Sequence, residues 1–437
     1  MDTPQLKLKL KKIRAIENAE IIIDGITVIT GENGSGKSTI SKLAYHTLKT
    51  ATKFDDIIDD SYNAALDSVL KAVNQIAKEL SSLVPNNEFI KLRLLRRIKS
   101  NQSSLFEEEQ NYLALAIDRL INLYHKIPSN LSNYGPNKLL RIRKILQDLM
   151  PEESSNKIDK LLAKLKESIE SGEVETNKLK EQRPINFLLD ILEDEFFDNP
   201  IPKTYNFEEF GVPIFNFRRK KIEPILTLKN IAYIDTPMIF GLENIYERSH
   251  WDDLNDLIRK KRSSAKNKTI DDLFKNNIFK GDIRPNDEKS KDNPFIYKRN
   301  NGEEFNLIEC ATGLKSFAIL QILFKNGYLD KNTLLIIDEP EAHLHPQWVV
   351  EYARLVVLLN KILGVKFLIA SHHPDMISAI RYISEKEEIT TNLHFYLAER
   401  EGSSYMYNYR HLGLDIEDIF ASFNIAFKRI DLYGKTD

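Results

Sequence analysis

One eight-residue segment, GENGSGKS at residues 31–38, constrains the fold of this 437-residue chain more than any other. It matches the pattern G-x-x-x-x-G-K-[ST] at every fixed position. The apolar run at residues 26–30 precedes it, and a helical pattern follows it. This strand, loop and helix context is the one that the motif requires. The segment therefore predicts an α/β fold that carries a phosphate-binding loop.

The residue types of this loop suit the binding of a nucleoside triphosphate. Glycines let successive backbone N–H groups turn toward phosphates, and the start of the following helix adds its positive dipole end. Lys37 supplies a cation for the β- and γ-phosphates, and the Ser38 hydroxyl is placed to coordinate Mg²⁺. The sequence therefore predicts ATP and Mg²⁺ as cofactors. The expected nucleotide-binding residues of the loop are Asn33, Gly34, Ser35, Gly36, Lys37, Ser38 and Thr39.

A second apolar run, at residues 334–337, ends in the carboxylates Asp338 and Glu339. ATPases with a phosphate-binding loop need such a strand, because it brings acids to the metal and to the attacking water. We expect Asp338 to be a metal ligand together with Ser38, and Glu339 to be the catalytic base. Asp338 follows Lys37 by roughly 300 residues, whereas a crossover between parallel strands needs only about a dozen. A large insertion must therefore separate the two motifs.

Residues 55–203 have the pattern of that insertion. Apolar residues recur three and four positions apart with charges between them, which predicts helices. The stretch Pro128–Pro136 breaks the pattern near its middle, as the tip of a helical hairpin would. The expected architecture is an ATPase head made of residues 1–54 and 204–437, interrupted by an all-helical insertion. The pattern leaves open whether the insertion is an arm or a lid.

Two expectations concern the strands at the ends of the chain. Asp24-Gly25 lies between two β-like runs and is a two-residue hairpin signal, so we expect these runs to pair. Near the C-terminus we expect strands at residues 394–397 and 405–409 and an amphipathic helix at 416–432. The apolar residues of that helix would close the core of the head or dock a partner. They are Phe420, Phe423, Ile425, Phe427 and Ile430.

Three further stretches, ECATGLKS (309–316), PEAHLHP (340–346) and FLIASHHP (367–374), complete an ordered set of motifs. The order of phosphate loop, signature helix, acidic strand, D-loop and switch histidine resembles that of the ABC-type ATPases. The DEPEAHLHP and SHHP stretches are similar to the soluble branch of SMC-like DNA-repair ATPases, OLD-family nucleases, and ATPase subunits of anti-phage systems such as Septu and PARIS. The resemblance covers about residues 5–50 and 225–400. It implies an ABC-type ATPase head.

The resemblance also implies roles for individual residues. Thr312 and Gly313 stand in the signature, which in relatives contacts the γ-phosphate of ATP held by the other subunit. Leu314 and Lys315 depart from the transporter form LSGGQ, although a lysine has the charge to reach that phosphate itself. His372 matches the switch histidine and is the second expected catalytic residue. The D-loop region, residues 341–343, lacks its usual aspartate.

Composition excludes several classes of protein. The single cysteine, Cys310, rules out a disulfide framework and a cysteine-based zinc site. The spacing of His343, His345, His372 and His373 does not match a zinc motif either. The N-terminus has no signal-peptide pattern, and no apolar run is long enough to span a membrane. We therefore expect a cytoplasmic protein with no membrane partner.

The charge balance gives no general attraction to nucleic acid, because the net charge is −2. Local basic clusters nevertheless keep nucleic acid as a candidate partner. Solvated faces balanced by nearby acids are the alternative interpretation. The clusters are Arg93 with Arg96 and Arg97, residues 218–221, and residues 259–262.

The motifs together predict an ATPase that dimerises head to head around two ATP molecules. The resemblance offers three roles: scaffold of a separate effector nuclease in anti-phage defence, DNA-repair or chromosome-maintenance ATPase, or transporter motor. The missing LSGGQ and the large insertion argue against the third. Only 65 residues follow His372, too few for the nuclease domain that DNA-cutting relatives carry there. We therefore expect no nuclease in this chain and an effector in trans.

Overall fold

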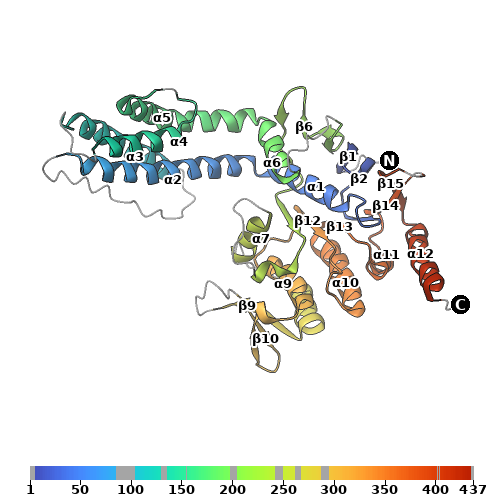
Figure 1. Ribbon diagram of the computed structural model, residues 1–437. Helices are drawn as coiled ribbons and strands as arrows, with labels where there is room; N and C mark the ends of the chain where they lie inside the picture. The colour runs from blue at the N-terminus through green and yellow to red at the C-terminus, as the bar shows by residue number, and fades with distance from the viewer. Residues whose placement is uncertain are drawn as a thin grey trace. The chain divides into compact units, whose positions relative to one another are not determined.

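The computed structural model describes residues 5–84, 104–128, 135–153, 155–196, 204–241, 250–260, 267–286, 295–400, 402 and 404–434 (Figure 1). The chain divides into two compact units. The first, the head unit, joins Met1–Thr52 to Pro184–Asp437, and the second, the helical unit, is Lys53–Arg183. The helical unit thus ends some twenty residues earlier than the insertion expected from the pattern, and residues 184–203 belong with the head unit.

A mixed ten-stranded sheet forms the centre of the head unit, in the order β5-β4-β1-β2-β15-β14-β3-β13-β12-β8. The strands are β1 (Leu6–Ile13), β2 (Ile16–Ile22), β3 (Ile26–Thr30), β4 (Asn206–Glu209), β5 (Val212–Pro213), β8 (Asn230–Ile234), β12 (Thr333–Asp338), β13 (Lys366–Ala370), β14 (Leu393–Arg400) and β15 (Tyr407–Gly413). Five neighbouring strands, from β14 to β8, run parallel.

The parallel strands bring the motifs to one edge of the sheet. Every residue of β3, β12 and β13 is buried, as expected for strands covered on both faces. β13 lies between β3 and β12 and pairs with both. Because the strands are parallel, their carboxyl ends meet at the same edge. The phosphate loop after β3, Asp338 at the end of β12 and Ser371 after β13 therefore come together.

The head unit also contains helices, some of which contact strands of this sheet (Figure 1). They are α1 (Lys37–Thr52), α6 (Asn186–Phe196), α7 (His250–Arg259), α8 (Lys268–Asp272), α9 (Thr312–Lys325), α10 (Pro346–Leu363), α11 (Pro374–Lys386) and α12 (Glu417–Gly434), with short helices η1 (Pro237–Gly241), η2 (Leu273–Phe279, a π-helix) and η3 (Leu307–Glu309). A small sheet is formed by β9 (Gly281–Pro285), β10 (Phe295–Arg299) and β11 (Glu304–Asn306), and a hairpin by β6 (Phe215–Asn216) and β7 (Lys221–Ile222). Apolar residues of α9 and α10 make up a large part of the hydrophobic core of the head unit.

The hairpin predicted at Asp24-Gly25 is wrong. β2 pairs with β1 and β15, whereas β3 pairs with β13 and β14. The tight turn lies one strand earlier, where Ile13 faces Ile16. Gly25 has another role, because a Cβ atom there would lie 2.2 Å from the carbonyl oxygen of Asn392. The glycine allows a close approach of two backbones rather than a turn between paired strands.

Among its described residues, the helical unit contains a bundle of four helices. They are α2 (Phe54–Ser81), α3 (Ser104–His125), α4 (Gly135–Leu149) and α5 (Ile158–Gln182). Their inward faces share a core of aliphatic side chains, including Ile117, Leu120, Ile142 and Leu161, none of them measurably exposed. The expected helical insertion is therefore confirmed. Most of the expected break at Pro128–Pro136 lies outside the described residues.

The C-terminal elements also match expectation. β14 and β15 pair antiparallel and complete the sheet beside β3, and α12 follows them. Ile416 and Ile419 are buried in the core of the head unit, and Phe420 packs against it. The side chains of Phe423, Ile425, Phe427 and Ile430 lie outside the described residues. Across the described chain, no helix combines the length and the apolar character that a membrane span requires.

Candidate nucleotide-binding and hydrolysis site

The phosphate loop takes its shape from glycines in conformations that other residues rarely adopt. Gly36 has φ 97°, and a Cβ atom there would lie 2.8 Å from Cγ1 of Ile16. Gly31 has φ 153°, and its Cβ would lie 2.6 Å from Cβ of Ala398. Larger residues would push the loop away from the sheet at both positions. The sequence pattern and the packing therefore require the same glycines.

The lysine of the loop is buried and folds back over it. Lys37 is 7% exposed, and its Nζ donates to the carbonyl oxygens of Gly31 at 2.9 Å and Glu32 at 3.1 Å. Burial lowers the pKa of Lys37, and the charges of the carboxylates Glu339, Asp338 and Glu341 oppose that shift. An ammonium group held by neutral carbonyls and facing several acids is well placed to accept an anionic ligand.

Two further features of the loop fit a triphosphate. The Ser35 hydroxyl is buried and has no hydrogen-bond partner. The Ser38 side chain is exposed at the start of α1, where it can reach a ligand. A bound phosphate would supply the missing partner of the loop and interact favourably with the helix N-terminus. The expected loop residues therefore form a coherent site, with Asn33 and Gly34 exposed and Thr39 half-buried.

Asp338 lies at the end of β12 and is held by three hydroxyl groups. It accepts hydrogen bonds from Ser41 Oγ at 2.5 Å and from Tyr233 OH at 2.9 Å, and the Ser38 side chain is a third donor. Burial raises the pKa of Asp338, and these three hydrogen bonds counteract the rise. Ser38 and Asp338, far apart in sequence, are thus adjacent, as two ligands of one Mg²⁺ must be.

Sequence analysis missed Ser41 and Tyr233. Ser41 lies three residues after Ser38 on the same helix, so helical spacing places both hydroxyls on one face. That spacing was a usable signal. Tyr233 comes from β8, which pairs with β12 only in the folded sheet, and nothing in its local sequence marks it.

Glu339 occupies a strained backbone position and faces the expected switch histidine. Its φ is 47°, in the left-handed region, and its N–H donates to the carbonyl of Ala370 at 2.8 Å. Such conformations are concentrated at functional sites because they cost free energy. Oε1 of Glu339 lies 3.5 Å from Nδ1 of His372, and both side chains are about half exposed. The two expected catalytic residues are therefore together.

Glu341 is a third residue of the site that was not expected from the sequence. It is 6% exposed, and its Oε1 accepts hydrogen bonds from Ser371 Oγ at 2.8 Å and from the His372 N–H at 3.1 Å. Nδ1 of His372 also lies 3.5 Å from this oxygen. Oε2 is buried without a partner. Glu341 thus holds the backbone at His372. The sequence had suggested no role for Glu341, because the D-loop region lacks its usual aspartate.

The signature residues begin α9 and pack on the loop after β12. A Cβ atom on Gly313 would lie 3.0 Å from Cδ2 of Leu344 and 3.4 Å from the carbonyl oxygen of His343. Thr312 is half-buried, whereas Lys315 is 6% exposed and interacts with Cys310. Gly313 thus neighbours the loop after β12, and Lys315 neighbours Cys310. Their expected partner is a phosphate held by another subunit.

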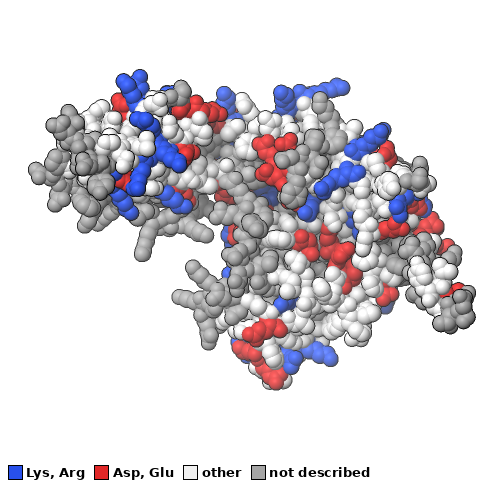
Figure 2. Space-filling view, in the orientation of Figure 1, with Lys and Arg blue, Asp and Glu red and all other residues white. Residues whose placement is uncertain are grey.

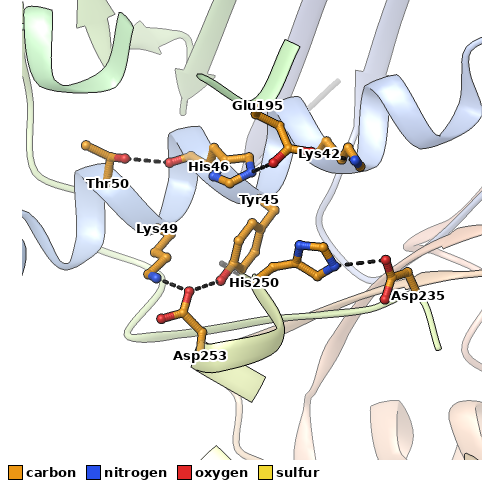
Figure 3. Close-up of polar contacts among 9 residues, drawn as sticks. All are labelled: Lys42, Tyr45, His46, Lys49, Thr50, Glu195, Asp235, His250 and Asp253. Atoms are coloured by element: carbon orange, nitrogen blue, oxygen red, sulfur yellow. Dashed lines mark hydrogen bonds and ion pairs between the residues drawn. The ribbon is translucent and has the colours of Figure 1, made fainter. Parts of the chain in front are cut away.

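A network of polar side chains supports α1 (Figure 3). From α1, Lys42 pairs with Glu195 of α6, while Tyr45 and Lys49 both bind Asp253 of α7. Further along, His250 and Trp251 bind Asp235, each at 2.8 Å. The rings of His250 and Tyr233 lie 4.8 Å apart, which connects this network to the tyrosine that holds Asp338.

Glu195 is the most strongly perturbed acid of this network. Burial raises the pKa of Glu195, but hydrogen bonds and charges from His46 and Lys42 outweigh it and lower the value to about 2. His46 Nε2 lies 3.5 Å from Glu195, too far for a good hydrogen bond, and burial lowers the pKa of His46 itself. Lys42 is therefore the principal partner of Glu195.

The described basic clusters have acidic or polar neighbours. Lys221 lies 3.4 Å from Glu223, Lys260 pairs with Asp256, and Arg259 donates to Asn255 at 2.8 Å. Figure 2 shows basic and acidic side chains interspersed on the face in view. The cluster of Arg93, Arg96 and Arg97 lies outside the described residues, as do residues 261 and 262. The described part of the clusters therefore fits the alternative interpretation, a solvated surface whose basic charge is balanced by nearby acids.

The sheet order and the meeting of Lys37, Ser38, Asp338 and Glu339 at one edge define a P-loop ATPase. The profile of the AAA ATPase domain family matches residues 6–377, and the chain belongs to that family. No curated protein matches it.

Solved structures resemble the chain only weakly. The Smc head bound to the C-winged helix domain of ScpA has 13% identity and a TM-score of 0.40, over 94% of this chain and 98% of that one. The SMC head domain from Thermotoga maritima has 11% identity and a TM-score of 0.35, over 94% and 98%. For cbiO1 from Clostridium perfringens, part of the ABC transporter complex cbiONQ, the values are 12% and 0.34, over 99% and 96%. Likenesses at these scores support no inference.

Proposed function

We propose that this chain binds ATP with Mg²⁺ at the edge of its sheet and hydrolyses it to ADP and phosphate. The observation that carries the proposal is the arrangement of Glu339 and His372 beside Asp338 and Lys37. Lys37 and the loop N–H groups bind and orient the β- and γ-phosphates. Ser38 and Asp338 would hold Mg²⁺, which neutralises charge on the transferring phosphoryl group when bound.

The remaining residues act on the attacking water. Glu339 is exposed enough to meet water, and its carboxylate accepts a proton as the water attacks. His372 lies beside that carboxylate and orients it or contacts the γ-phosphate. Glu341 fixes the backbone at His372 through two hydrogen bonds. Each of these residues lies at the end of, or directly after, a rigid parallel strand, which suits a site that must hold its geometry.

We further propose that ATP joins two heads, each supplying its signature to the nucleotide of the other. Thr312 and Gly313 at the start of α9 offer a helix N-terminus to a phosphate, and Lys315 adds a cation nearby. Support comes from the neighbours found for these residues, which are Leu344 and His343 for Gly313 and Cys310 for Lys315. Without a second subunit, the signature has no phosphate to contact.

Light scattering tests this step with the slow variant Glu339→Gln. ATP should convert it from monomer to dimer, and Gly313→Asp should prevent the change by placing a carboxylate against the γ-phosphate. Gly313→Ala is the matched control, because it adds no charge and its Cβ meets the flexible end of Leu344 at 3.0 Å and the His343 carbonyl oxygen at 3.4 Å. A nucleotide-independent monomer in the Glu339→Gln protein would contradict the proposal.

We propose that this ATP-dependent dimer regulates or scaffolds a separate effector nuclease in cytoplasmic anti-phage defence. The resemblance of the DEPEAHLHP and SHHP stretches to such ATPase subunits supports it. The SMC-like alternative, a DNA-repair or chromosome-maintenance ATPase, requires a nucleic-acid surface, and Lys221 and Lys260 of the described basic clusters lie beside acids. Purification from the native host should recover a nuclease with the chain, and the chain alone with Mg²⁺ and ATP should leave plasmid and RNA intact. Recovery of no nuclease, or cleavage by the pure chain, would contradict this role.

A further inference from the structure

A cavity of about 600 Å³ lies beside the signature, apart from the phosphate loop. Its walls come from the end of η2, from β10, from the start of α9, and from the loop that leads into α10. The lining residues are Ile278, Phe279, Lys280, Tyr297, Arg299, Ala311, Gly313, Leu314, Phe317, His343, Leu344, His345 and Trp348. This volume lies within the range of sites for small molecules, about 300–1,000 Å³.

Aromatic side chains form much of the wall. The rings of Phe317 and Trp348 lie 5.6 Å apart, edge to face, and those of Phe279 and Tyr297 lie 6.2 Å apart. Phe279, Tyr297 and Phe317 are buried, and Trp348 is half-buried. Rings held by packing in this way offer flat apolar surface to a ligand at little cost in conformational entropy.

Besides the polar atoms of Tyr297 and Trp348, the cavity is lined by the basic residue types Lys280, Arg299, His343 and His345. No aspartate or glutamate lies among the described lining residues. Glu303, outside the lining, binds Arg299 at 3.1 Å and so balances part of its charge. The side chain of Lys280 is exposed, at the residue directly after η2. A ligand that combines a flat aromatic ring with negative charge complements both the walls and this lining.

We propose that this cavity binds a small aromatic anion of the nucleotide class. The ring lies against the aromatic wall formed by Phe317 and Trp348, and the anionic group meets Lys280 and Arg299. The enclosed volume suits a single nucleotide rather than a polymer. None of the residues of the phosphate loop lines this cavity, so its ligand is separate from the ATP that this chain's own loop would hold.

The position of the cavity gives its ligand a route to control. Gly313 and Leu344 both line it, and they are in such close contact that a Cβ on Gly313 would lie 3.0 Å from Cδ2 of Leu344. Leu344 lies five residues after Glu339 in the same loop. An occupant therefore changes the spacing of signature and D-loop and with it the stability of the ATP-bound dimer. This regulatory step, unlike the binding itself, rests on the proposed function.

Fluorine NMR of the full chain labelled with 5-fluorotryptophan tests the binding. The chain has two tryptophans, and Trp348→Phe identifies the signal of the one in the cavity. AMP is the probe, in the Lys37→Ala background that disables the phosphate loop. AMP should shift the Trp348 signal saturably and leave Trp251 unchanged. Lys280→Gln should weaken AMP about tenfold, as expected for one charge-assisted contact, and adenosine should bind more weakly than AMP.

Lys268→Gln is the matched control, since Lys268 is also exposed, lies at the start of α8 and does not line the cavity. Three results would overturn the proposal: no saturable shift of Trp348 with AMP, equal affinity for AMP and adenosine, or equal weakening by the two lysine variants. A shift caused only by an acidic peptide would reassign the cavity to a protein segment. Because the background cannot bind ATP, failure of the ATPase proposal would leave this result intact. If AMP binds but the ATP-dependent dimer of Glu339→Gln is unaffected by it, the regulatory step is wrong.

Discussion

Oε1 of Glu339 lies 3.5 Å from Nδ1 of His372, although the two residues leave different strands of the sheet. The left-handed backbone of Glu339, with φ 47°, is part of this arrangement. A left-handed conformation at a residue other than glycine costs about 1–3 kcal/mol of stability. Without the contacts of the folded sheet, Glu339 would therefore adopt a more favourable backbone conformation. The hydrogen bond from its N–H to Ala370 at the end of β13 helps to hold it. The fold thus keeps Glu339 in a strained backbone conformation beside His372, where both side chains can meet solvent.

Lys37→Ala should abolish measurable ATP binding. The variant removes the single ammonium group that the loop encloses, and with it the cation for the β- and γ-phosphates. Isothermal titration with ATP and Mg²⁺ measures the loss. Lys386→Ala, at an exposed lysine near the end of α11, should bind as the unchanged protein does. Equal affinities of the two variants would show that the loop is not the nucleotide site.

Glu341→Ala should lower kcat about tenfold or more and leave KM nearly unchanged. It removes the acceptor of the Ser371 hydroxyl and of the His372 N–H, so the histidine loses its fixed position. The buried Ser371 hydroxyl would be left without this acceptor, which should also cost about 1–3 kcal/mol in the free energy of unfolding.

Glu341→Gln is the control that separates the positioning role of Glu341 from a role of its negative charge. Its carbonyl oxygen can accept the same two hydrogen bonds, so it should restore most of kcat if Glu341 only positions His372. Steady-state kinetics and urea unfolding of both variants provide the measurement. Unchanged kcat in Glu341→Ala would exclude the positioning role.

The motifs that sequence analysis recognised depend on chemistry at consecutive residues, and these the structure brings together. Gly36, Lys37 and Asp338 belong to short patterns whose context is local. Tyr233 and Glu341 were missed because their roles depend on which strands become neighbours. The hairpin error at Gly25 has the same origin: a glycine required by close approach of Asn392 has the same sequence signal as one required by a turn.

Glu195→Gln should destabilise the head unit near neutral pH, and its effect should shrink as the pH falls below about 4.5. The pKa of Glu195, ordinarily 4.5, falls to about 2 in the folded chain, so its charged form stabilises the fold. That contribution is fully present above about pH 4.5 and is lost as the pH falls through about 2. With solvent screening, we expect about 1–2 kcal/mol near neutral pH.

Urea unfolding near neutral pH and at about pH 3 measures this difference. Glu193→Gln, an exposed glutamate two positions earlier on α6, is the matched control and should change stability little at either pH. A Glu195→Gln penalty that stays constant, or grows, toward low pH would contradict the assignment of Lys42 as its partner.

The most direct test of the account is the rate of ATP hydrolysis by Glu339→Gln under single-turnover conditions. Glutamine keeps the size of the side chain and its place beside His372 but cannot accept the proton of the attacking water. ATP affinity, measured separately by titration, should stay within a few-fold of the unchanged protein, while the hydrolysis rate should fall about 10²–10⁴-fold. Hydrolysis at the unchanged rate would contradict the assignment of Glu339 as the catalytic base and with it the proposed mechanism.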